Sequence, residues 1–156
     1  MKNRDVADVW NKYYLGVPYK IGGQNSEEGY DCISLVYTFY AKLGIDIYAI
    51  HANTKYNYIT AKNYLEYWSG SNEDTELIRD WALSLGKQID KAYRITGDLL
   101  ICYYEEQKQW FLSIYLGNDL CSFILAESKK ITVCPYKILE YTIYKIIRLS
   151  ETKREK

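Results

Sequence analysis

The pattern of apolar residues changes at Thr96-Gly97-Asp98, and this change constrains the fold more than any other feature of the sequence. Before this point apolar residues recur at helical spacing, at residues 6–14 and 32–43 and in shorter runs around Leu65 and Trp81. After it the chain consists of short β-prone segments separated by turn signals, at residues 99–104, 111–116, 120–126, 131–133 and 142–149. Helices followed by an antiparallel meander predict an α+β domain, with the helices packed on one sheet of about five strands.

Composition limits the classes of protein to which the chain can belong. Its 156 residues are 48% hydrophobic and include 18 Tyr, which suits one folded domain and excludes a disordered chain. We expect this domain over residues 1–150 and a charged, solvated tail over 151–156. No apolar stretch has the length of about 18 residues that a membrane span needs. Since 20 Lys+Arg balance 20 Asp+Glu, we do not expect a nucleic-acid binder either.

The cysteines and the histidine indicate a protein without a metal or cofactor. The four cysteines contain no Cys-x-x-Cys pair, and the chain has a single histidine, His51, so a zinc site of the usual spacing is not expected. The first residues lead into an amphipathic pattern and show no secretory signal. We therefore expect reduced thiols, most of them small buried hydrophobic residues.

Cys32 is the cysteine whose position suggests chemistry. If Asp31 caps the following helix by accepting the amide of Ser34, Cys32 occupies the first turn, where unpaired amides and the helix dipole favour a thiolate. The negative charge of Asp31 opposes this effect. Spacing alone leaves open the alternative that Cys32 only begins the apolar stripe of its helix.

Several motifs resemble those of the NlpC-type cysteine peptidases. Around Cys32 they are Pro18-Tyr19 followed by Gly22-Gly23, then Asp31-Cys32-Ile33-Ser34-Leu35-Val36, then Leu43-Gly44-Ile45. Farther on, Gly97-Asp98-Leu99-Leu100 and Ile114-Tyr115-Leu116-Gly117 are similar to the family's turn into its sheet and to one of its strand ends. The resemblance covers about residues 14–149, and the polar stretch before the second strand is similar to copies found in phage tail-tip proteins.

The resemblance implies a papain-like fold that hydrolyses bacterial cell-wall peptides through a Cys–His pair and a third polar residue. Cys32 would be the nucleophile, and Tyr19, Asp31 and Ser34 would lie at the substrate site. The sequence departs from the family pattern at the position of the catalytic histidine, which is Phe111, and at the third polar position, which falls near Leu125. Neither side chain can transfer a proton, a contribution typically worth roughly 10²–10⁴-fold in rate.

Two functions therefore remain open. In the first, which the missing base favours, the chain is a degenerate, catalytically impaired member of the family. It would bind cell-wall peptide or glycan, or form a structural part of a phage-tail-like assembly, with a cytoplasmic or virion-associated location. In the second, it is an active thiol hydrolase, a stem-peptide endopeptidase or amidase, that uses Cys32 with a non-standard base. His51, in the loop that follows the nucleophile helix, is the candidate for this base.

Overall fold

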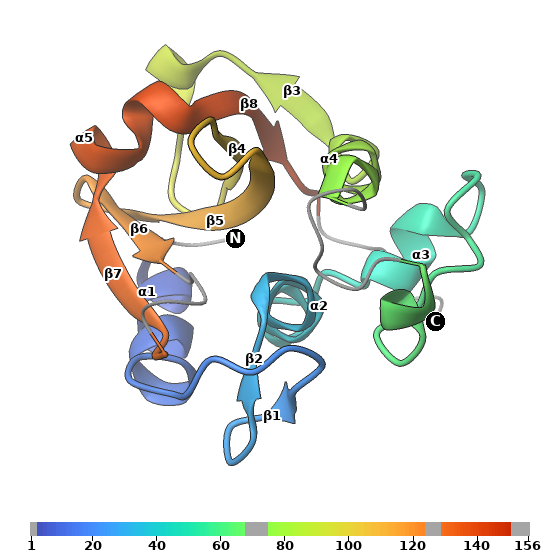
Figure 1. The fold of residues 1–156 in the computed structure, drawn as a ribbon. Helices are drawn as coiled ribbons and strands as arrows, with labels where there is room; N and C mark the ends of the chain where they lie inside the picture. The colour runs from blue at the N-terminus through green and yellow to red at the C-terminus, as the bar shows by residue number, and fades with distance from the viewer. Residues whose placement is uncertain (1–2, 68–74, 124–128, 151–156) are drawn as a thin grey trace.

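The computed structural model describes residues 3–67, 75–123 and 129–150, and it combines a helical first half with a large sheet in the second half (Figure 1). The α-helices are α1 (Asn3–Tyr13), α2 (Cys32–Lys42), α3 (Ile47–His51), α4 (Thr75–Leu83) and α5 (Tyr136–Leu139). Short 3-10 helices are η1 (Tyr64–Glu66), η2 (Lys91–Tyr93) and η3 (Glu140–Thr142). None of the helices within these ranges is long and apolar enough to cross a membrane.

The main sheet has six antiparallel strands in the order β3-β8-β4-β5-β6-β7. Its strands are β3 (Lys87–Ile89), β4 (Leu99–Tyr104), β5 (Gln109–Gly117), β6 (Leu120–Phe123), β7 (Thr132–Pro135) and β8 (Ile143–Arg148). A separate two-stranded hairpin, β1 (Gln24–Asn25) and β2 (Gly29–Tyr30), precedes α2. The consecutive strands β4 to β7 are neighbours in the sheet, and residues 105–108 and 118–119 form the turns that join β4 to β5 and β5 to β6. The sequence signal Gly117-Asn118-Asp119 predicts the second of these turns.

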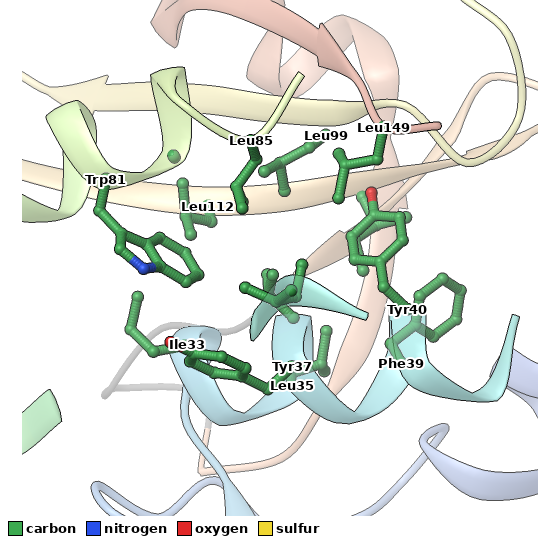
Figure 2. Close-up of a cluster of buried hydrophobic side chains, with 14 of the residues drawn as sticks. Ile33, Leu35, Tyr37, Phe39, Tyr40, Trp81, Leu85, Leu99, Leu112 and Leu149 are labelled. Carbon is green, nitrogen blue, oxygen red and sulfur yellow. The ribbon is translucent and has the colours of Figure 1, made fainter. Parts of the chain in front are cut away.

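Side chains of the central strands alternate between two buried clusters, one on each face of the sheet. On the first, which we call the helical face, Ile101, Leu112 and Ile114 pack with residues of α1, α2 and α4. Figure 2 shows Leu99 and Leu112 of the sheet and Trp81 of α4 lying across from Ile33 and Tyr37 of α2. On the opposite face, Cys102, Phe111 and Tyr115 pack with Tyr136 and Leu139 of α5.

The architecture confirms the α+β prediction, with one strand more than expected. The five predicted β-segments correspond to β4 through β8, although residues 124–126 of the third segment and the tail 151–156 lie outside the described residues. The additional strand, β3, pairs only with β8 at the edge of the sheet, and Lys87 and Gln88 are exposed. An edge strand with polar, exposed side chains has no apolar alternation, so the sequence carries no signal for it.

A buried hydrogen bond ties α2 to the start of the sheet. The Tyr40 hydroxyl donates to the backbone carbonyl of Gly97 at 2.7 Å, and the Tyr40 side chain is fully buried. Gly97 itself has a φ of 99°, a conformation that glycine adopts without strain. The bond therefore fixes the helix that carries Cys32 against the turn that leads into β4.

We expect Tyr40→Phe to lower the free energy of unfolding by about 1–2 kcal/mol, because the buried carbonyl of Gly97 loses its hydroxyl donor. Urea denaturation followed by circular dichroism measures this change. Tyr141→Phe is the matched control, since Tyr141 is 95% exposed and should leave the midpoint unchanged. Equal midpoints for both variants would show that the bond to Gly97 does not stabilise the fold.

Candidate functional site

Helix α2 begins at Cys32, and the cap that the sequence predicts is formed. Asp31 Oδ1 accepts hydrogen bonds from the backbone amides of Ile33 at 3.0 Å and Ser34 at 2.8 Å. The Ser34 hydroxyl in turn accepts from the Asp31 amide at 3.0 Å, which completes a capping box. Both side chains are buried. Asp31 and Ser34 thus serve the helix start, and Cys32 occupies its first turn.

The second oxygen of Asp31 joins two more segments to this helix start. Asp31 Oδ2 accepts from the amide of Gly22 at 2.8 Å and from the hydroxyl of Tyr64 in η1. Tyr64 is fully buried, and the sequence pattern around it indicates only an apolar helical run, so its role at Asp31 could not be foreseen. The carboxylate of Asp31 therefore holds together the glycine loop, the start of α2 and η1.

The Cys32 thiol lies in surroundings that oppose its ionisation. Cys32 is half-buried and packs against the cluster on the helical face. Burial, and then the negative charge of Asp31, raise the pKa of the thiol to about 12, and the backbone of Leu112 and of Cys32 itself lowers it only in part. The helix start does not outweigh these effects, so the thiol is protonated at neutral pH.

His51 lies in the helical core, where it has partners other than Cys32. The His51 ring ends α3, is 1% exposed and lies between Tyr56 and Trp81, with centroid distances of 5.8 and 5.5 Å. His51 Nε2 is 2.6 Å from Ser84 Oγ, and the Ser84 hydroxyl donates to the Trp81 carbonyl at 2.6 Å. The hydroxyl therefore accepts a hydrogen bond from Nε2–H, and the buried Nδ1 has no hydrogen-bond partner among the described residues, which fits a neutral ring with its proton on Nε2. Burial lowers the pKa of His51, in agreement with a neutral ring.

The structure does not bring Phe111 to Cys32. Phe111 belongs to the cluster on the α5 side of the sheet and stacks on Tyr104 at 4.9 Å, whereas Cys32 packs on the helical face. Because side chains alternate along β5, the neighbour of Phe111 in the chain, Leu112, packs on the same face as Cys32, and its backbone also acts on the thiol. The other predicted degenerate position, Leu125, lies outside the described residues.

Tyr19 lies in the loop that leads to Gly22 and is half-buried against the helical core. Its backbone forms a parallel bridge with Tyr30, and its amide donates to the carbonyl of Lys129 at 3.0 Å. Tyr19 is therefore held close to the residue that precedes Asp31. Within the described residues, no group of three or more His, Cys, Asp or Glu side chains is placed to hold a metal ion.

Comparisons with known proteins identify the family of the chain. The model of the NlpC/P60 family matches residues 16–145, most of the chain. The chain belongs to the NlpC/P60 family. This membership confirms the family that the motifs around Cys32 predict, and the papain-like fold with it. None of the curated proteins matches the chain.

Solved structures of this family have the same fold at low sequence identity. An NlpC/P60 family protein from Bacillus cereus ATCC 10987 has a TM-score of 0.61 and 18% identity, over 95% of this chain and 40% of that protein. The NlpC/P60 domain of the peptidoglycan hydrolase SagA has a TM-score of 0.59 and 17% identity, over 96% of this chain and 100% of that domain. The peptidoglycan hydrolase RipB from Mycobacterium tuberculosis has a TM-score of 0.52 and 19% identity, over 96% of this chain and 67% of that protein. This NlpC/P60 domain thus spans less than half of the Bacillus cereus protein.

Because the pKa of Cys32 is raised to about 12, we expect its alkylation by iodoacetamide to be slow at pH 7 and to rise without a plateau beyond pH 9. Peptide mapping by mass spectrometry at a series of pH values measures the rate at Cys32 alone. The same chain unfolded in urea is the control, since its thiols should approach a plateau above the ordinary pKa of about 8.5. An alkylation rate at Cys32 that is already constant near pH 6 would contradict the conclusion that the thiol is protonated at neutral pH.

The lowered pKa of His51 predicts that the folded state loses stability in acid. The unfolded chain takes up a proton at His51 near the ordinary pKa of about 6.5, while the folded chain resists it until lower pH. The stabilising contribution is therefore complete above about pH 6.5 and declines as the pH falls below that value. His51→Phe keeps a ring between Tyr56 and Trp81 and should lose less stability between pH 7 and pH 5 than the unaltered protein does, in urea denaturation. Equal losses in the two proteins would refute the assignment of a neutral His51.

Proposed function

We propose that this NlpC/P60 domain binds cell-wall peptide at the Cys32 site without hydrolysing it. The observation that carries the proposal is the placement of the chain's single histidine. His51 is bound to Ser84 in the helical core, and reaching Cys32 would require its removal from between Tyr56 and Trp81. This arrangement disfavours the alternative of an active hydrolase with His51 as its base.

The chemistry of the thiol supports the same proposal. With its pKa raised to about 12, the Cys32 thiol is protonated at pH 7. Peptide-bond cleavage also needs an acid to protonate the leaving amine. The motif resemblance assigns this role to the position of Phe111, whose side chain has no proton to donate and packs on the other face of the sheet. Both steps of a cysteine-peptidase reaction are therefore unfavourable here.

The ligand class follows from the family. SagA and RipB, whose folds this chain shares, are peptidoglycan hydrolases. The motif resemblance places Cys32 and Asp31 at the substrate site, and the structure keeps both at the start of α2. A structural role in a phage-tail-like assembly, and the cytoplasmic or virion-associated location, stay predictions, since no observation bears on either.

We expect the purified protein to sediment with peptidoglycan sacculi and to release no new amino groups from them. Cys32→Ala should sediment to the same extent, because a non-catalytic thiol contributes only its packing to the site. Sedimentation followed by gel densitometry measures binding, and amine derivatisation of the supernatant measures cleavage.

An active peptidoglycan hydrolase run in parallel confirms that the sacculi are cleavable. Release of amino groups by the unaltered protein, abolished in Cys32→Ala, would establish the hydrolase alternative. Failure of both proteins to sediment with sacculi would refute the proposed binding function.

A further inference from the structure

Two cysteines that the Cys32 site does not use face each other across the last two strands of the sheet. Cys121 of β6 and Cys134 of β7 are register partners in this antiparallel pair. Partners in register point their side chains to the same face, and both thiols belong to the buried cluster on the α5 side. Both cysteines are free in the structure. They therefore form a dithiol pair, which we call the β6–β7 thiols.

The register of the two strands gives the β6–β7 thiols a spacing that suits a disulfide. The Tyr136 amide donates to the Asp119 carbonyl at 2.7 Å, two positions along the same ladder. Hydrogen-bonded pairs alternate along an antiparallel ladder, so Cys121 and Cys134 are also a hydrogen-bonded pair. The Cα atoms of such a pair are about 5.5 Å apart, at the centre of the range that disulfides need.

The other two cysteines are not placed to compete for this bond. Cys32 packs on the helical face, so the sheet separates it from the β6–β7 thiols. Cys102 shares their face but lies on β4, and β5 stands between β4 and β6. Two strand spacings of about 4.8 Å put the Cα atom of Cys102 beyond the limit of about 7 Å for a bridge to Cys121.

The electrostatics of the pair show that its two sulfurs lie close together and that they differ in reactivity. Burial, and then the neighbouring Cys134 thiol, raise the pKa of Cys121 to about 12, and the charge of Arg94 lowers it only in part. Burial raises the pKa of Cys134 to about 11. Cys134 is also 8% exposed, whereas Cys121 is fully buried. Cys134 is therefore the thiol that meets an oxidant first, and its reaction should be faster in alkaline solution.

We propose that the β6–β7 thiols are a site of oxidative modification, at which a small-molecule disulfide such as glutathione disulfide converts Cys121 and Cys134 into a protein disulfide. The Cys134 thiolate attacks one sulfur of the oxidant and releases one small thiol. Cys121 then loses its proton, attacks the Cys134 sulfur of the mixed disulfide and releases the second small thiol. The two cysteines together lose two electrons and two protons, which the oxidant gains.

The bridge would also secure a segment that supports the loop around Tyr19. Strand β7 is the edge of the sheet, where β6 is its only neighbouring strand among the described residues. The residues just before β7 are bonded to this loop, because the Gly16 amide donates to the Ile131 carbonyl at 2.9 Å and the Tyr19 amide to the Lys129 carbonyl at 3.0 Å. A covalent link from β6 to β7 therefore restrains the strand from which these bonds extend.

The test is a peptide map of the full chain after reduction, unfolding in urea and refolding at about pH 8.5 in a mixture of reduced and oxidised glutathione. Refolding lets the thiols react before burial limits their access. The four cysteines fall in four different tryptic peptides, which are residues 21–42, 95–108, 109–129 and 131–137. After alkylation, mass spectrometry should find peptide 109–129 linked to 131–137, with Cys32 and Cys102 alkylated.

A second measurement compares the thermal stability of the oxidised and the reduced protein by circular dichroism. The bridge closes a segment of about 14 residues and restricts the unfolded chain, so we expect Tm to rise by roughly 5–10 °C. Cys134→Ala should abolish this rise. Cys102→Ala is the matched control, because it removes a buried cysteine on the same face and should leave the rise in place.

Four free thiols after refolding, a bridge to Cys32 or Cys102, or glutathione retained on Cys134 would each overturn the inference. A bridged protein whose Tm is no higher than that of the reduced protein would also overturn it, since the strands would then not be placed for the bond. The peptide map needs no variant, so the inference stays testable if Cys134→Ala does not fold. None of these outcomes depends on the proposed function.

Discussion

The carboxylate of Asp31 is the interaction on which the rest of the site depends. One oxygen caps α2, and the other accepts from the glycine loop and from Tyr64 in η1. Three segments that are up to 42 residues apart in the sequence, from Gly22 to Tyr64, therefore meet at a single side chain. A buried carboxylate is stable only when it has such partners, so the site is assembled around the charge rather than around the thiol. The same charge is one reason that Cys32 stays protonated.

The structural elements that define the NlpC/P60 fold are distinct from the side chains that its chemistry requires. The capped helix, the glycine loop and the antiparallel sheet are retained, and they are the features that give the family likeness. They need only packing and backbone hydrogen bonds. Proton transfer needs an additional side chain at the thiol, and the β5 residues that pack on that face include Trp110, Leu112 and Ile114. Under the proposed function, the fold therefore presents a binding surface without the side chains that proton transfer requires.

Local signals in the sequence predicted the parts of the structure that short segments determine. Asp31-Cys32-Ile33-Ser34 predicted the cap because all its partners lie within three residues. The short β-prone segments predicted β4 to β8, because each strand buries its own apolar residues. The pairing of Tyr64 with Asp31 joins positions 33 residues apart, and a buried tyrosine in an apolar run resembles any core residue. The sequence also could not predict on which face of the sheet Phe111 lies. Motif spacing identifies a position along a strand, whereas the register of the sheet determines the face on which that side chain lies. His51 was expected in a loop, but a cap at Asp46 forms α3 and places the ring in the core.

Under the proposed function, in which the domain lacks a catalytic base, the burial of Leu112 determines how readily it could acquire one. Leu112 is 3% exposed within the core between the sheet and its helices. A histidine at that position would replace apolar packing with a polar ring in a dry environment, at a cost of about 2–5 kcal/mol out of a total stability of about 5–15 kcal/mol. Evolution toward turnover would therefore first have to accumulate stability elsewhere in the chain. At Leu112, selection for fold stability favours the apolar side chain, whereas selection for catalysis would favour a base.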